Sequence, residues 1–223
     1  LITDYLRTRD QMEFTPEPDM FHDIFGHLPL LTQEFYARIE DKFAPAYMNA
    51  TQEEREVIKR LAWYSTEFGL VVQDNRFKVF GAGIISGRKE LTRTIMEFYR
   101  LGRDNVIDYS KDAFKQLQRH FLASKNNLYR IIDGVNALHQ KGQMSSESQG
   151  WNVVHSLYDN LGIAREGIFG GEVILVPFDV ETIARIPKTV YAFNPMLFVC
   201  ESLEQMDTIL DSYLKPIALR AGK

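Results

Sequence analysis

The sequence predicts a single domain that is mainly α-helical with a small β component. Apolar residues recur at helical spacing over most of the chain, and only short runs have the apolar character of strands. The 223 residues are enough for one hydrophobic core, and they contain no internal repeat and no clean domain boundary. We therefore expect one domain over residues 1–223.

The composition is that of an ordinary soluble globular protein, with 45% hydrophobic and 25% charged residues. A net charge of −4 with interleaved signs leaves no basic footprint for nucleic acid. The chain begins at Leu1, and no signal peptide or apolar run of the roughly 18 residues that a membrane span needs is present. The single cysteine, Cys200, fits a reducing compartment. We expect a cytoplasmic protein without nucleic-acid or membrane partners.

Prolines and glycines punctuate the first elements. Two prolines favour an extended entry over residues 1–17. Asp19 is expected to cap a short helix that Gly26 and Pro29 close. Apolar residues at helical spacing predict a second helix over 33–43.

A capping box marks the next helix. Thr51 and Glu54 have the required spacing, and the helix that they open is expected to run to Gly69. The stretch Lys78–Ile85 carries glycines and alternates poorly, which indicates a short strand or a bulge. The remaining expected elements are helices over 88–102, 111–139, 151–161 and 202–213, a polar loop over 141–150, a tight turn over 167–171, and strands over 173–176 and 196–200.

Two histidines and one carboxylate are candidate metal ligands. His22 and His27 lie five positions apart beside the predicted turn, and Glu67 follows inside the apolar stretch Leu61–Leu70. Two imidazoles and one carboxylate suit a non-haem Fe(II) that keeps open positions for O2 and substrate. A carboxylate in an apolar setting is costly unless it is paired, hydrogen-bonded or metal-bound. These residues favour an iron oxygenase.

The spacing of the two histidines constrains their geometry. Five residues of a straight α-helix turn through about 500°, so His22 and His27 do not share a face. They converge only if the helix ends near Gly26 and the chain curls. The spacing also differs from that of zincin proteases, which place histidines at i and i+4 with a glutamate beside the first.

A purely structural interpretation of these residues competes with the metal site. In this interpretation His22 caps a helix, His27 is a surface turn residue and Glu67 lies at a helix edge. The histidine pair alone favours the structural interpretation, whereas the apolar setting of Glu67 favours a metal site. The other histidines lack carboxylate or cysteine partners at useful spacing and are read as surface or helix residues. They are His120, His139 and His155.

Several separated motifs, in one order, resemble the pterin-dependent aromatic amino acid hydroxylases. The most specific is Thr15-Pro-Glu-Pro-Asp19 followed by His22, Gly26-His27 and Pro29. The others are Trp63–Leu70, Gly81–Gly83 through Ser86 with Glu90-Leu91, and Phe193–Ser202. The resemblance covers roughly residues 5–91 and 172–214, and ordered motifs are more specific than a lone metal pair.

The resemblance implies a set of ligands and contacts. The family oxidises phenylalanine, tyrosine or tryptophan with Fe(II), O2 and a tetrahydropterin. His22, His27 and Glu67 match its iron ligands, Arg7 matches the arginine that pairs with the substrate carboxylate through its planar fork, and Asp23 stands at a position tied to pterin. The positions that match the amino-acid pocket are Thr15, Pro18, Trp63, Phe68, Gly83, Ser86 and Val199.

Some of these matches have plainer explanations. Trp63 and Phe68 could equally be core aromatics. Ser86 could be a strand-end serine, although its family counterpart supports a metal-bound histidine by a hydrogen bond.

The sequence also departs from the family pattern. Asp23 replaces a glutamate, and Ala62 and Leu197 replace tyrosines of the active site. In the family, a stretch that precedes the position of Tyr5 holds much of the pterin. Residues 92–171 have no counterpart in the typical domain, and we expect a helical insertion there that covers the site, makes an interface or is a packed appendage.

We therefore expect a non-haem Fe(II) monooxygenase that hydroxylates the ring of an aromatic amino acid, phenylalanine, with O2 and tetrahydropterin. Two alternatives stay open: a pterin-independent iron oxygenase that acts on another substrate, and a degenerate domain that binds without catalysis. The departures at pterin positions favour the first alternative. The intact ligand set argues against the second.

Overall fold

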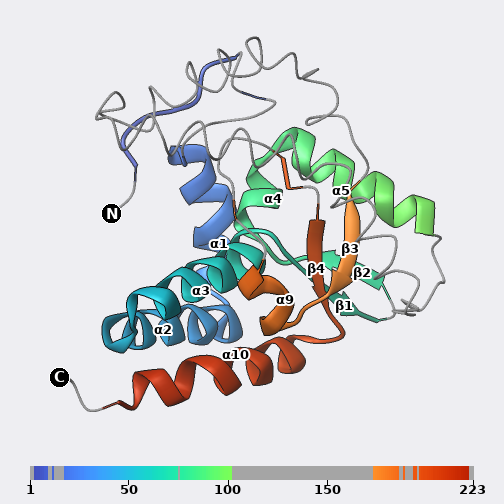
Figure 1. Ribbon diagram of the computed structural model, residues 1–223. Helices are drawn as coiled ribbons and strands as arrows, with labels where there is room; N and C mark the ends of the chain where they lie inside the picture. The colour runs from blue at the N-terminus through green and yellow to red at the C-terminus, as the bar shows by residue number, and fades with distance from the viewer. Residues whose placement is uncertain are drawn as a thin grey trace, which may run out of the picture.

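The computed structural model describes residues 3–9, 12, 18–74, 76–101, 173–185, 188, 193–194 and 196–220, and Figure 1 shows its elements. In chain order they are the π-helix η2 (His22–His27), α1 (Leu28–Leu31), α2 (Glu34–Asn49), α3 (Gln52–Ala62), the π-helix η3 (Trp63–Glu67), β1 (Gly69–Gln73), β2 (Arg76–Val79), α4 (Ala82–Ser86), α5 (Arg88–Leu101), β3 (Ile174–Pro177), α9 (Val180–Arg185), β4 (Met196–Cys200) and α10 (Leu203–Ala218). The expected mainly helical domain with a small β component is confirmed. Within the described part, no helix combines the length and the apolar character of a membrane span.

The four strands form one mixed sheet in the order β2-β1-β4-β3. Strand β1 is antiparallel to β2 and parallel to β4, and β3 is parallel to β4. Successive residues of β4 point to opposite faces, so Phe198 joins the larger apolar cluster and Val199 joins the smaller one. All five residues of β4 are buried, which explains why the strand is a continuous apolar run in the sequence.

The larger cluster lies between the sheet and the helices. Helix α10 runs along α2, and α3 lies beside them (Figure 1). The capping box predicted for α3 is confirmed, because Thr51 accepts from the N–H of Glu54 at 3.3 Å and its own N–H donates to the Glu54 carboxylate at 2.8 Å. This box fixes the start of the helix that leads to Glu67.

The first helix differs from its prediction. Asp19 caps it as expected, since its Oδ1 accepts from the N–H of His22 at 3.0 Å. However, the helical segment continues through Leu31, so neither Gly26 nor Pro29 ends it. Pro29 falls in the first turn of α1, directly after a π turn that already interrupts the i→i−4 ladder, and its missing N–H therefore removes little.

Other boundaries also differ. Helix α2 continues to Asn49 through an exposed Pro45, because Ala46 beyond it is buried in the larger cluster. The helix expected to reach Gly69 ends at Glu67, and strand β1 begins at Gly69 instead. The stretch 78–85, expected to be a short strand or a bulge, contains the end of β2 and most of helix α4. Helix α9 was not predicted, and α10 extends to residue 218, beyond the expected end at residue 213.

The remaining expectations separate into two groups. The helix expected over 88–102 is confirmed as α5, and the two late strands are confirmed as β3 and β4. The helices expected over 111–139 and 151–161, the loop over 141–150 and the turn over 167–171 lie outside the described residues.

A buried ion pair holds the N-terminal segment to the first helix. The side chain of Asp19 is fully buried, and its two oxygens accept from Nη2 of Arg7 at 2.6 Å and from Nε at 2.9 Å. The backbone N–H of Arg7 adds a bond of 2.8 Å. Burial acts to raise the pKa of Asp19, but the hydrogen bonds from Arg7 and His22 outweigh it and lower the pKa from 3.8 to about 2.

Gly26 gives a first prediction. A Cβ on this residue would lie 2.9 Å from the backbone oxygen of Ala82, so η2 packs against α4 at van der Waals limits. Helix propensity alone would make Gly26→Ala stabilising by about 1 kcal/mol. We expect the opposite sign, a loss of about 1–3 kcal/mol from overpacking, in urea unfolding. The exposed Ala44 of α2 calibrates propensity through Ala44→Gly, and a stabilised Gly26→Ala would contradict the close packing.

Asp19 gives a second prediction, for the pH dependence of stability. A carboxyl with a lowered folded pKa stabilises the protein above its unfolded pKa of 3.8 and loses this contribution as the pH falls towards about 2. Asp19→Asn leaves Arg7 without its partner, so we expect a loss of about 3 kcal/mol at pH 7. In urea unfolding, the gap to the wild type should narrow between pH 4 and pH 2.5. A pH-independent gap, equal to that of the exposed control Asp41→Asn, would refute the role of the charge.

Candidate metal centre

A π-helical turn brings the two histidines together. In η2 the N–H of Leu28 donates to the carbonyl of Asp23, so the ring closes over five residues instead of four. The wider turn places residues five apart on the same side of the helix. The ring centroids of His22 and His27 lie 4.8 Å apart. The two residues thus converge inside a continuous helix, and the predicted curl at Gly26 was wrong.

The third candidate ligand ends a second π turn. In η3 the N–H of Phe68 donates to the carbonyl of Trp63 at 2.9 Å, and Glu67 is the last residue of this turn. Its Oε1 lies 3.0 Å from Nε2 of His27, and its Oε2 lies 3.6 Å from Nε2 of His22. The two Nε2 atoms are 3.0 Å apart. Among the described residues, these three side chains form the group able to hold a metal ion.

Ser86 sets the tautomer of His22. Its Oγ lies 2.7 Å from Nδ1 of His22 and donates its proton to the carbonyl of Ala82 at 2.9 Å. Because a serine hydroxyl has one proton, Oγ accepts from Nδ1–H of His22. The lone pair of this imidazole is therefore on Nε2, which faces His27 and Glu67. The contact is the one that the resemblance leads us to expect of Ser86, and the support of a metal-bound histidine by this residue stays a prediction.

The surroundings shift the pKa values of the two histidines in opposite directions. Burial lowers the pKa of His22, which keeps the ring neutral and able to ligate a metal ion. Burial also acts to lower the pKa of His27, but its hydrogen bond to Glu67 and the charge of that carboxylate outweigh burial and raise the pKa. The side chain of His22 is 9% exposed, against 23% for His27 and 26% for Glu67, so the site opens to the surface on one side.

The donor set fits a divalent metal ion. Nε2 of His22, Nε2 of His27 and the Glu67 carboxylate converge on one point, and their lone pairs repel one another unless a proton or a metal cation lies between them. Two ligands that each lie about 2.1 Å from an ion, at a right angle, are about 3.0 Å apart. Two imidazoles and one carboxylate are also the donors of non-haem Fe(II) oxygenase sites. His22, His27 and Glu67 can therefore hold such an ion without large movement.

Arg7 lies behind the metal ligands. Its Nη1 donates to the carbonyl of Ser86 at 2.8 Å, while Nε and Nη2 are bound to Asp19. The side chain is 4% exposed. Contacts with the described residues thus engage three of the five N–H groups of the guanidinium, and one on each terminal nitrogen has no acceptor among those residues.

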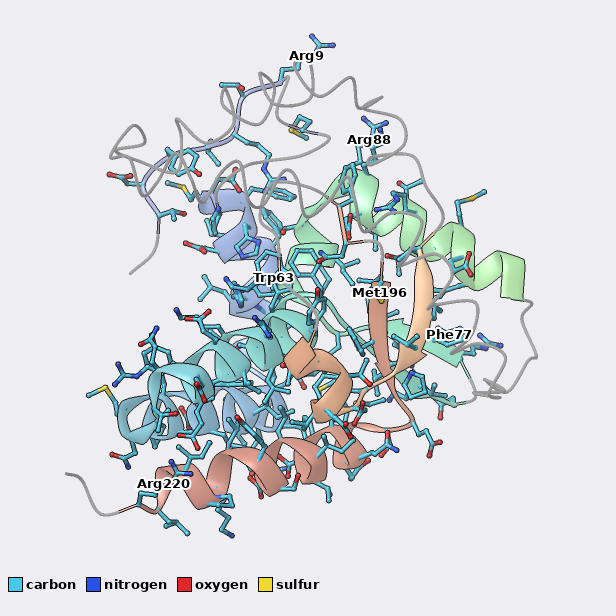
Figure 2. The ribbon with its side chains drawn as sticks, viewed as in Figure 1. Arg9, Trp63, Phe77, Arg88, Met196 and Arg220 are labelled. Atoms are coloured by element: carbon cyan, nitrogen blue, oxygen red, sulfur yellow. The ribbon has the colours of Figure 1, made fainter. Side chains whose placement is uncertain are left out.

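An aromatic wall adjoins Glu67. The rings of Trp63 and Phe68 lie with centroids 4.5 Å apart, and Gly83 packs under Phe68. A Cβ at Gly83 would lie 2.6 Å from the Phe68 ring. Figure 2 shows the side chains, with Trp63 near the centre of the molecule. The structure thus brings together these three residues of the expected amino-acid pocket.

A buried polar chain holds Trp63 and was not predicted. The indole N–H donates to Oδ1 of Asn194 at 3.0 Å, and the backbone N–H of Asn194 donates to Oε1 of Glu90 at 3.3 Å. Both partners are buried, and burial raises the pKa of Glu90 to about 7. Asn194 and Glu90 lie in motifs that were noted for the resemblance, but their spacing carries no signal of this pairing.

The other expected site residues are spread around this centre. Val199 is buried in the smaller apolar cluster, against which Phe68 packs. Pro18 is exposed beside Asp19, and Thr15 lies outside the described residues. Leu197, at the position of a family tyrosine, is fully buried in the same cluster as Val199.

Asp23 binds the N-terminal segment. Its Oδ2 accepts from the backbone N–H of Thr3 at 2.7 Å and from the Thr3 hydroxyl at 2.9 Å. Burial acts to raise the pKa of Asp23, but these bonds outweigh it and lower the pKa. The carboxylate is therefore ionised, and one of its oxygens is already engaged.

Solved structures show the same fold. A phenylalanine hydroxylase from Chromobacterium violaceum, solved with bound iron(III) and the oxidised cofactor 7,8-dihydrobiopterin, superposes with a TM-score of 0.53 at 21% identity. The alignment covers 97% of this chain and 52% of that chain.

Curated relatives show similarity over part of the chain. Phenylalanine-4-hydroxylase from Pseudomonas aeruginosa is 36% identical over 96 residues, which are 43% of this chain and 37% of the relative. Tyrosine 3-monooxygenase from Canis lupus familiaris is 35% identical over 95 residues, which are 43% of this chain and 19% of the relative. The chain thus covers well under two thirds of the length of either relative.

The sequence profile of the biopterin-dependent aromatic amino acid hydroxylases matches residues 1–141. This match includes residues 92–141, the first part of the expected insertion, so the insertion stays a prediction. It also includes all three candidate metal ligands and spans more than half of the chain. The chain belongs to the biopterin-dependent aromatic amino acid hydroxylase family.

Proposed function

We propose that the protein is an iron-dependent monooxygenase that hydroxylates the ring of phenylalanine with O2 and a tetrahydropterin. The observation that carries the proposal is the cluster of His22, His27 and Glu67, whose ligand atoms lie within 4.8 Å of one another beside an aromatic wall. The iron(III) and dihydrobiopterin of the Chromobacterium enzyme support the choice of metal and cofactor. The relatives include enzymes named for phenylalanine and for tyrosine, so the substrate is part of the proposal.

The three ligands would hold the metal ion from the buried and the exposed side of the site. His22 contributes a neutral Nε2 from the buried side, and Ser86 keeps its ring in place. His27 and Glu67 contribute their atoms from the exposed side, where O2 and substrate have access. Iron and pterin, when bound, supply the redox chemistry of O2. The chain supplies geometry and a pocket with restricted water.

The amino acid would be held at both ends. Trp63 and Phe68 offer aromatic faces for offset or edge-to-face contact with its ring. The two remaining N–H groups of Arg7 would donate to its carboxylate, from a position already fixed by Asp19. Gly83 leaves room for the Phe68 ring against α4, and a Cβ at this position would force the ring to move.

The contacts of Asp23 bear on whether the protein uses pterin, because Thr3 already occupies Oδ2 of this carboxylate. A direct contact to pterin through this residue would have to use Oδ1. This observation favours, as a second candidate, an iron oxygenase that does not consume pterin. The two candidates differ in one measurable quantity, the ratio of pterin oxidised to amino acid hydroxylated.

The test is therefore a stoichiometric assay. Protein loaded with Fe(II) is given phenylalanine, O2 and tetrahydropterin, and tyrosine and oxidised pterin are quantified together. We expect equal amounts of both, and His22→Ala should lose both iron retention and turnover. Exposed Glu204→Gln on α10 serves as the control. Tyrosine formation without pterin would select the second candidate, and full iron occupancy in His22→Ala would refute the metal site.

Arg7→Lys tests the carboxylate contact. Lysine keeps the charge but loses the planar fork, so we expect KM for phenylalanine to rise about tenfold, as for the loss of one charge-assisted hydrogen bond. Turnover at saturation should change little, because the carboxylate is bound similarly in the ground and transition states. The exposed Arg38→Lys on α2 is the matched control. An unchanged KM would remove Arg7 from the substrate site and leave it as the partner of Asp19.

A further inference from the structure

The second metal-ligating histidine also faces a hydroxyl group. The hydroxyl of Tyr36, on α2, lies 3.4 Å from Nδ1 of His27. The side chain is almost fully buried, and its ring packs against Phe80 with centroids 5.0 Å apart. In the sequence, Tyr36 has the spacing of an apolar position of the helix expected over 33–43, and this spacing carries no signal of the polar contact.

The direction of this hydrogen bond follows from the other contacts of the hydroxyl. Tyr36 donates to the carbonyl of Thr66 at 3.0 Å, and the carboxyl of Glu40, one turn further along α2, is a second acceptor within reach. A phenol has one proton, and either acceptor takes it. Toward His27 the oxygen of Tyr36 therefore accepts, so Nδ1 of His27 carries a proton and Nε2, the nitrogen that faces Glu67, is the one left for a metal ion.

A tyrosine hydroxyl has an ordinary pKa of about 10, so the phenol is uncharged and carries its proton at pH 7. Its orientation is set by α2 and by the backbone of η3, independently of His27.

The arrangement repeats that of the other histidine. At His22 the hydroxyl of Ser86 accepts from Nδ1 and donates to the carbonyl of Ala82. At His27 the hydroxyl of Tyr36 faces Nδ1 and donates to the carbonyl of Thr66, the residue before Glu67. One buried hydroxyl on α2 thereby contacts both π turns that carry the metal ligands.

We propose that Tyr36 is a positioning residue of the metal centre, which sets the tautomer and the ring orientation of His27 as Ser86 does for His22. The inference rests on the proposed metal site. Hydrogen bonds behind metal-bound histidines typically contribute 10–100-fold to metal affinity. Loss of the Tyr36 hydroxyl should therefore weaken metal binding by this factor.

The experiment compares Tyr36→Phe with the wild type. Phenylalanine keeps the ring and its contact with Phe80 and removes only the oxygen. Metal-free protein is titrated with Co(II), followed by visible absorption, and thermal unfolding is recorded with and without Co(II). We expect a Kd for Co(II) that is 10–100-fold higher and a smaller metal-induced rise in Tm, because this rise depends on the Kd. Tyr47→Phe, on the same helix beside Arg55, should behave as the wild type.

The metal-induced rise in Tm separates positioning from a purely structural role. If Tyr36 only stabilises the fold, Tyr36→Phe lowers Tm equally with and without Co(II), the Kd is unchanged and the proposal is overturned. Trimethylamine N-oxide in all samples keeps a destabilised variant folded, so that both results remain readable. If the wild type itself shows no Co(II) binding, the metal site fails and this inference falls with it.

Discussion

Two hydrogen bonds that span five residues determine the metal centre. In an α-helix, residues five apart are rotated by about 140°, and His22 and His27 would point to different sides. The bond from the N–H of Leu28 to the carbonyl of Asp23 widens the turn and brings the two histidines together. The bond from the N–H of Phe68 to the carbonyl of Trp63 widens the turn that ends at Glu67 in the same way. Such turns are rare on their own, so tertiary contacts have to stabilise them.

Those contacts form a closed polar ring around His22. Asp19 accepts from the backbone of His22 and from Arg7, Arg7 donates to the carbonyl of Ser86, and the hydroxyl of Ser86 bonds His22. The same buried carboxylate thus sets both a metal ligand and the proposed anchor of the substrate.

The candidate ligands and several elements could be predicted from the sequence, because their signals are local. The capping box at Thr51 and the continuous apolar run of β4 are of this kind. The π turn was not predictable, since a change of hydrogen-bond register leaves no residue pattern. Strand β1 was not predicted, and its first residue, Gly69, was placed at the end of the preceding helix, because a short apolar run fits either element. Pro45 does not end α2, because burial of Ala46 in the larger cluster overrides the local signal.

The hydrogen bonds of polar atoms at core positions could not be predicted from the sequence either. Tyr36 and Trp63 have the spacing of core aromatics, and they are indeed buried or half-buried. The roles proposed for them depend on one oxygen and one N–H, whose partners come from elements distant in the sequence. Periodicity reports which side of a helix faces the core, but it does not report what a polar atom meets there.

The exposure of the three candidate ligands indicates whether they would form a structural or a catalytic metal site. The hydroxyl groups of Ser86 and Tyr36 lie on the buried side and hold the rings, while His27 and Glu67 are about a quarter exposed. Structural metal sites are closed by four protein ligands, whereas catalytic sites keep positions open. Three candidate ligands, held by hydroxyl groups on the buried side and accessible on the other, would form a site of the second kind, which supports the proposed catalytic function over a degenerate domain that keeps the fold for binding alone.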